Sequence, residues 1–372
     1  PYAYRTKDYG TTWSRIVDEN DVKSYTLSIV EDPMNANLLF LGTDDGLYIS
    51  LNAGNQWMKW TAGFPTVSTK DLVIQPREHD LVIGTFGRAA WVLDDIRPLR
   101  AMANGNVLTK TLQLFAPPTA YQAAYQQPTG SRFGGDALFN GENKRSGAMI
   151  SYYINRPAAA KEEKKEKETA RKKKRKGTKK MEAPIVKKEL ASEVKFDSIK
   201  LEIFEGARLI RTLHQKAPKE NGIHRMYWSM NEKGADRPSR KIRKRTYEPR
   251  GVSVKPGSYN LKMSFGNQTS ESSIKVEFDP RLEMSTEAIT EIYNASKDME
   301  KDQQLMADVV KQLVESKNTA TAFKKDLTKE DKKNYKDQIK ASKDIITKID
   351  KLIAIYIGSV DKRQGITRNP EV

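Results

Sequence analysis

The feature that most limits the fold of this chain is a short turn pattern near its start, at residues 6–13 (Thr-Lys-Asp-Tyr-Gly-Thr-Thr-Trp). Asp8 can accept backbone N–H groups and fix a turn, as aspartates do in Asx-turns. Gly10 can adopt the positive φ that such a turn requires, because it has no Cβ. Trp13 then begins the next strand and packs over the turn. The pattern therefore predicts a β-hairpin whose turn is held by side-chain hydrogen bonds.

A weaker copy of the pattern lies at residues 50–57. Asn52 stands where the first copy has aspartate, while Gly54 and Trp57 keep the other two positions. The copies are 44 residues apart, from Asp8 to Asn52, which is about the length of one four-stranded blade of a β-propeller. Because asparagine replaces aspartate, the second turn departs from the strict pattern.

The first hundred residues read as short strands separated by turn signals. Segment 26–33 is echoed by 71–76, and 39–43 by 81–85, so a repeat of 42 to 43 residues accompanies the two turns. The expected strands are rich in β-branched, aromatic and leucine residues and lie at 2–5, 13–17, 25–30, 38–42 and 47–50.

The two turns resemble the Asp-box of BNR-type β-propellers. Residues 84–96 (Gly-Thr-Phe-Gly-Arg-Ala-Ala-Trp-Val-Leu-Asp-Asp-Ile) are similar to the last-blade motif of large bacterial sortilin/VPS10-like BNR-repeat proteins, which are often labelled glycosyl hydrolases. Further landmarks of this resemblance lie at residues 115–118, 147–153 and 278–281. The resemblance implies a C-terminal fragment of such a protein. It also implies export to a bacterial periplasm or cell surface, and binding of a protein, peptide or glycan.

The expected fold is mainly β. Two blades cannot close a ring, so missing N-terminal blades are expected to complete the propeller. Strands with one buried face follow, in an order that resembles an Ig-like domain. The predicted domains are the last propeller blades at 1–115, an Ig-like β-sandwich at 116–281 with a basic disordered insertion at 156–192, a helical hairpin at 282–358 and a tail at 359–372.

Residues 285–357 change to a helical pattern. Apolar residues recur every seven positions on each of two segments, which indicates two helices with one packing stripe each. A polar link near 316–330 is expected to join them as an antiparallel hairpin, capped by Ser285 or Thr286 and ended by Gly358. An oligomer interface is the alternative use of these stripes. The stripes are Ile292, Met299, Met306 and Leu313 beside Val310, and then Tyr335, Ser342, Ile349 and Tyr356 alternating with Ile339, Ile346 and Ile353.

The net charge of +17 comes mostly from two segments. Residues 161–180 carry twelve Lys/Arg and four Glu, and residues 237–250 carry seven Lys/Arg and one Glu. Such runs are typical of polyanion-binding patches or of solvated loops. The run at 171–176 lacks the interleaved aromatic residues that stack on bases, so a nucleic-acid partner is not expected. No apolar stretch is long enough for a membrane-spanning helix.

The sequence offers few candidates for chemistry. It has no cysteine, and its three histidines are too scattered for a metal site, so no metal or cofactor is expected. Arg88 and Trp91 could form a recognition surface, although Trp91 also suits the core between blades. Asp94 and Asp95 could bind a cation, but a turn-capping role with pairing to Arg88 or Arg97 suits them better.

The main functional expectation is therefore a non-catalytic, ligand-binding scaffold. The alternative is part of a sialidase-like glycoside hydrolase whose active site lies largely in the missing blades. The spacing of Arg88, Tyr48 and Asp94/Asp95 does not assemble the Arg cluster, Tyr nucleophile and acid/base pair that a sialidase needs. Polyanion binding by the basic segments is a third possibility.

Overall fold

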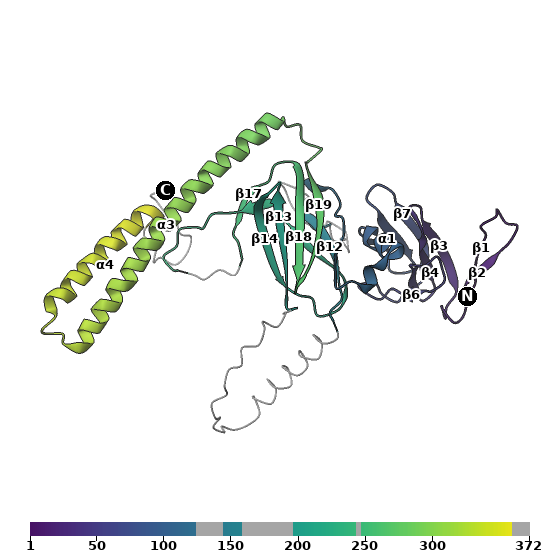
Figure 1. Cartoon of the computed structure of the whole chain (residues 1–372), viewed down its shortest axis with the longest axis horizontal. Coiled ribbons are helices and arrows are strands. Elements are labelled where there is room, and N and C mark those ends of the chain that lie inside the picture. The colour runs from purple at the N-terminus through teal and green to yellow at the C-terminus, as the bar shows by residue number, and fades with distance from the viewer. Residues whose placement is uncertain (124–143, 158–195, 243–246, 359–372) are drawn as a thin grey trace, which may run out of the picture. The chain divides into compact units, whose positions relative to one another are not determined.

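The computed structural model describes residues 1–123, 144–157, 196–242 and 247–358. It is rich in β-structure, with several antiparallel sheets and a C-terminal pair of packed helices (Figure 1). The basic stretch at 161–180 and the tail at 359–372 lie outside the described residues, and the predicted domain limits stay a prediction. The chain divides into two compact units, described separately below: 1–208, 214–229 and 257–279 form the first, and 209–213, 230–256 and 280–372 the second.

The first unit begins with three antiparallel sheets, each built from consecutive strands joined by short turns. These positions agree with the expected strands to within a few residues. The sheets are β1 (Ala3–Arg5) and β2 (Ser14–Val17); β3 (Thr26–Asp32), β4 (Asn35–Thr43), β5 (Gly46–Ser50) and β6 (Met58–Lys59); and β7 (Thr69–Gln75), β8 (Asp80–Thr85) and β9 (Ala90–Leu93).

The sheets β3–β6 and β7–β9 repeat each other in detail. Thr26 pairs with Thr43, and Thr69, which lies 43 positions after Thr26, pairs with Thr85, which lies 42 positions after Thr43. Each ladder then has an irregularity at the next residue of its first strand. A Cβ on Gly42 would lie 2.7 Å from the carbonyl oxygen of Thr69, so glycine permits the close approach of the two sheets. The sequence repeat therefore corresponds to a structural repeat.

Two apolar clusters hold these sheets together. One face of β4 and β5, with Phe40 and Ile49, packs on the Leu81/Ile83 face of β8. The opposite face, with Leu41, packs on the β1–β2 ribbon. Helix α1 (Arg97–Asn104) follows β9, and its N-cap residue Ile96 and its residue Leu99 belong to the first cluster. A short 3₁₀ turn, η1 (Asn106–Thr109), ends the segment. The buried residues of both clusters are less than a tenth exposed.

Two further sheets complete the first unit. Trp228, which is fully buried, meets the ring of Tyr259 edge-on at 5.5 Å and so links the two sheets. In spatial order the first sheet is β10 (Leu112–Leu114), β12 (Ala148–Ile154) and β15 (Gly222–Trp228). The second is β11 (Ala120–Gln122), β19 (Gln268–Phe278), β18 (Gly257–Phe265), β13 (Ser198–Glu205) and β14 (Arg208–Lys216), of which 209–213 belong to the second unit.

The second unit combines a two-stranded ribbon with the helix pair. The ribbon is β16 (Asn231–Lys233) with β17 (Arg250–Ser253), and the helices are α3 (Thr286–Glu330) and α4 (Lys336–Ile357). Ser285 caps α3 by accepting the N–H of Ala288 at 3.1 Å, and α4 ends at Gly358 with φ of 71°, as the sequence predicts. The Nζ of Lys317 lies 2.5 Å from Oδ1 of Asp350, which fits an antiparallel pair.

The predicted polar link at 316–330 is wrong. Helix α3 continues to Glu330, because no glycine or proline interrupts 286–357 and a polar surface suits an exposed helix face. The turn lies at 331–335, where Oδ1 of Asp331 accepts the N–H groups of Lys333 and Asn334 at 2.9 and 3.2 Å.

The predicted stripe on α3 is wrong in its first half. Ile292 is 57% exposed and Met299 74%, while the buried seam consists of Val310 and Val314 against Ile349 and Ile353. The physical reason is length: α4 has 22 residues and α3 has 45, so α4 reaches only the second half of α3 (Figure 1).

Candidate functional site

The first predicted turn is built around the carboxylate of Asp8. Its Oδ1 accepts the backbone N–H of Thr12 at 2.8 Å, and its Oδ2 accepts the Thr12 hydroxyl at 2.6 Å. The Thr6 hydroxyl donates to Oδ1 and accepts the N–H of Gly10 at 2.7 Å. These hydrogen bonds, with those from Thr12 largest, lower the pKa of Asp8 to about 2. Gly10, at φ of 95°, allows the chain to reverse.

The second turn has the same backbone hydrogen bonds as the first, but the hydrogen bond between the side chains of Asn52 and Gln56 runs in the opposite direction to its counterpart. Oδ1 of Asn52 accepts the N–H of Gln56 at 2.9 Å, and the Ser50 hydroxyl accepts the N–H of Gly54 at 2.9 Å. Nδ2 of Asn52 donates to Oε1 of Gln56 at 3.4 Å, where the first turn has a threonine hydroxyl donating to a carboxylate. Asn52 and Gln56 occupy the positions of Asp8 and Thr12 in the first turn. Because both residues change together, the second turn keeps the shape of the first without a charged side chain.

The two tryptophans of the turns differ in their surroundings. Trp57 is 9% exposed and donates its Nε1–H to the carbonyl of Ile16 in the neighbouring ribbon at 2.7 Å. Trp13 is 61% exposed, and its Nε1–H bonds to Gly10 of its own turn at 3.1 Å. Trp57 thus links the β3–β6 sheet to the preceding β1–β2 ribbon, whereas no described sheet covers Trp13.

The segment after β8 places Arg88 and Trp91 differently. Arg88 is exposed in the β8–β9 turn. Trp91 is half-buried, meets Phe64 edge-on at 5.5 Å, packs on the main cluster and donates Nε1–H to the carbonyl of Arg88 at 3.0 Å. Phe86, 74% exposed with the Nζ of Lys70 5.8 Å from its ring, shares the turn with Arg88. Phe86 and Arg88, rather than Trp91, are therefore the large side chains that this turn exposes to solvent.

Asp94 and Asp95 follow β9 at its opposite end. Oδ1 of Asp95, a buried residue, accepts Nε of Arg97 at 2.5 Å, and its backbone N–H bonds to Asp80 at 2.8 Å. Its Oδ2 is buried without a hydrogen-bond partner among the described atoms. Arg225 donates to the carbonyl of Asp94. Asp94 and Asp95 thus lie directly before α1, and the guanidinium group of Arg97 binds the carboxylate of Asp95.

Strand β9 keeps Arg88 apart from the two aspartates. β9 has four residues, from Ala90 to Leu93, and a strand rises about 3.3 Å per residue, so its first and last residues are on the order of 10 Å apart. Arg88 and the two aspartates are thus held at opposite ends of β9.

A buried ion pair in this region has no counterpart among the sequence predictions. Nε and NH2 of Arg100, on α1, donate to the two carboxylate oxygens of Asp32 at 2.6 Å each, and NH1 contacts Nδ1 of His79 at 2.9 Å. Asp32 is 1% exposed and Arg100 8%. Burial, and then the positive charge of Arg100, lower the pKa of His79. Asp32 precedes a proline and reads only as a turn residue, and its partner is 68 positions away, so no local pattern indicates the pair.

The described residues offer little for catalysis or metal binding. Tyr48 is 7% exposed in the second apolar cluster, and burial raises its pKa, so its hydroxyl is a poor nucleophile there. No three His, Asp or Glu side chains within the described ranges lie close enough to share a metal.

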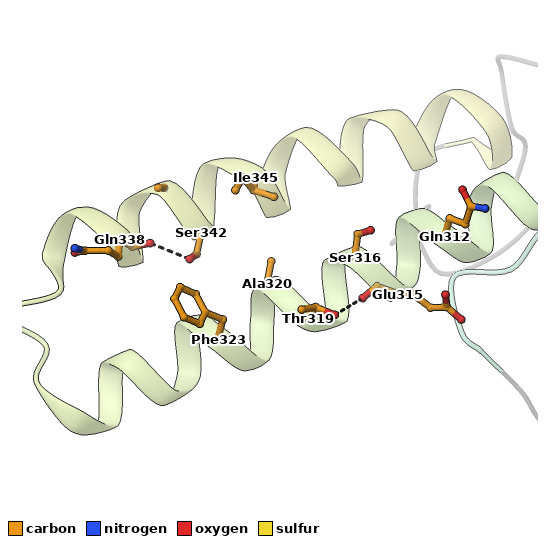
Figure 2. Close-up of a pocket in the computed structure, with 10 residues that line it drawn as sticks. Gln312, Glu315, Ser316, Thr319, Ala320, Phe323, Gln338, Ser342 and Ile345 are labelled. Carbon is orange, nitrogen blue, oxygen red and sulfur yellow. Dashed lines mark hydrogen bonds between the residues drawn. The ribbon is translucent and has the colours of Figure 1, made fainter.

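A groove of about 860 Å³ lies between α3 and α4 in the second unit. Figure 2 shows Phe323 and Ile345 on facing helices, with Ala320 and Ser342 between them. The Ser342 hydroxyl donates to the carbonyl of Gln338 on its own helix at 2.8 Å. Glu315 is the one charged side chain among the residues that line the groove, so charges do not converge there. Among the described helices, none combines the length and apolarity needed to cross a membrane.

Comparison with known proteins matches residues 2–97 to the Sortilin-Vps10 family model, described as sortilin, neurotensin receptor 3. This Sortilin-Vps10 domain, typically a ligand-binding propeller, covers the three N-terminal sheets. No curated protein matches the chain.

Proposed function

We propose that residues 1–115 are the terminal blades of a BNR-type β-propeller, and that the protein is a non-catalytic binding scaffold for a protein, peptide or glycan. The observation that carries the proposal is the Sortilin-Vps10 match over sheets that repeat in register and in turn chemistry. The same proposal assigns 116–281 to an Ig-like sandwich and places the protein at a bacterial cell envelope, after the family it resembles.

An exposed stripe on the second repeat supports the propeller assignment. Val73, Val82 and Val92 pair in register across β7, β8 and β9. Val73 is 54% exposed and Val92 56%. The equivalent stripe of the first repeat, Val30 with Phe40 and Ile49, packs in the main cluster against the next sheet. By the same relation, a further sheet is expected to cover the valines, as in a closed ring.

The separation of the candidate polar groups favours binding over hydrolysis. A glycosidase needs two carboxyl groups about the scissile bond, and a sialidase adds an arginine cluster. Here Arg88 and the Asp94–Asp95 pair lie at opposite ends of β9, and Asp95 is already paired with Arg97. The exposed Phe86 and Arg88 instead suit a contact surface, because aromatic and arginine side chains dominate interfaces.

Peptide and glycan arrays probed with the protein test this proposal. We expect a ligand whose binding falls at least about tenfold in Phe86→Ala/Arg88→Ala, the usual effect of a hot-spot pair. Arg77→Ala is the matched control, because its side chain is 81% exposed on a different turn. Fluorogenic sialosides should show no turnover. Hydrolysis that is lost in Arg88→Ala or Asp94→Asn would instead establish the glycoside hydrolase.

A further inference from the structure

The β16–β17 ribbon of the second unit places two positive side chains directly opposite each other. Lys233 pairs with Arg250 in the register of the ribbon, and both are exposed. Like charges in directly opposed positions destabilise a strand pair. Neither side chain has an ion-pair partner among the described residues. The ribbon therefore holds a repulsive pair that an external anion would relieve.

The acidic side chains near this pair are already used inside the unit. Glu232 is 4% exposed and accepts the Tyr293 hydroxyl at 2.6 Å and Nζ of Lys297 at 3.3 Å. Glu300 pairs with the same lysine. Glu248 accepts the backbone N–H of Thr212 at 2.8 Å. These three carboxylates are thus engaged inside the unit, and the exposed cations of the ribbon and its loop outnumber the exposed carboxylate of Asp236.

The loop between the two strands adds both charge and apolar surface. Arg237 and Lys241 are exposed and have no ion-pair partner among the described residues. Ile242 is 48% exposed and Tyr247 72%. A single tyrosine is a poor platform for stacking successive bases. Basic side chains beside an exposed aliphatic and an exposed tyrosine are instead the composition of a membrane-surface contact.

We propose that the exposed cations of the ribbon, Lys233 and Arg250, and of the loop between its strands, Arg237 and Lys241, bind an anionic phospholipid surface, with Ile242 and Tyr247 of the loop entering the headgroup region. The four cations contact lipid phosphates, and the negative surface brings the like-charged pair together without repulsion. This contact is peripheral and independent of any ligand bound by the N-terminal sheets.

Co-sedimentation of the whole chain with vesicles tests the proposal. We expect binding to phosphatidylglycerol-phosphatidylcholine vesicles, weakened by salt, and none to phosphatidylcholine alone. Lys233→Gln/Arg250→Gln should weaken the binding about thirtyfold, the change expected for two cationic side chains at an anionic membrane. Tyr247→Ser should weaken it less, because it removes no charge.

Lys340→Gln/Lys343→Gln is the matched control, since it removes two exposed charges of the same unit from α4. Far-UV circular dichroism checks that each variant is folded. An equal loss in the control and the ribbon variant would overturn the proposal, because net charge alone would then explain the binding. Ribbon-dependent binding of polyphosphate or DNA without vesicle binding would also overturn it.

Discussion

The carboxylate of Asp8 fixes the shape of its turn, and its ionisation makes the stability of the fold depend on pH. Its pKa is lowered from 3.8 to about 2, so the ionised side chain stabilises the fold above pH 3.8 and this stabilisation is lost as the pH falls through about 2. We expect Asp8→Ala to lower the melting temperature at neutral pH.

Asp8→Asn should keep the Oδ1 acceptor and so much of the stability, as Asn52 does in the second turn. It should also flatten the pH dependence of the melting temperature in the acid range, which thermal melts over a pH series would measure. Equal acid sensitivity in the wild type and Asp8→Asn would contradict the assigned role of the charge.

At the same scale, the buried pair of Asp32 and Arg100 marks a limit of sequence reasoning. The turns were predictable because their hydrogen bonds join residues four positions apart. The ion pair depends on how α1 packs against β4, which brings Arg100 to the end of β3, and no local pattern encodes this packing. The roles predicted for Arg88, Trp91, Asp94 and Asp95 likewise depended on which end of β9 each one occupies.

Among the elements, the helix pair separates what periodicity can predict from what it cannot. The sequence correctly predicted two helices, a cap at Ser285 or Thr286, of which Ser285 is the one observed, and the end at Gly358. It could not show that α4 covers only half of α3, because the seven-residue spacing of Ile292, Met299 and Met306 looks the same whether or not a partner faces it. The same reasoning failed at 316–330, where polar residues were read as a link although they extend a helix.

Paired truncations on α3 and α4 test which stripe forms the seam. Ile353 is 3% exposed and packs with Val310 and Val314, so Ile353→Ala should lower the free energy of unfolding by about 2–5 kcal/mol. Ile292 is 57% exposed, so Ile292→Ala should change it by less than about 0.5 kcal/mol. Urea denaturation followed by helical circular dichroism measures both. A larger loss for Ile292 would mean that a partner covers the first half of α3.

At the scale of the whole molecule, the repeat that relates the sheets β3–β6 and β7–β9 predicts that a further sheet packs on the second of them. In the first repeat the stripe of Val30, Phe40 and Ile49 is covered by the next sheet, whereas in the second repeat Val73 and Val92 of the equivalent stripe are exposed. The number of expected blades predicted an incomplete ring, whereas the exposed face on which we propose that a further sheet packs can be identified only once the strand register is known.

The substitution Val73→Asp tests this closure. In the present chain Val73 is 54% exposed, so the change should cost about 1 kcal/mol or less, the range of strand preferences. In a chain extended by preceding blades, the same aspartate would be buried without a partner and should cost several kcal/mol. Leu81→Ala, in the core in either case, should cost about 2–5 kcal/mol in both chains. Denaturant titrations of the two chains measure these differences, and an equally small effect of Val73→Asp in both would rule out a closing blade on this face.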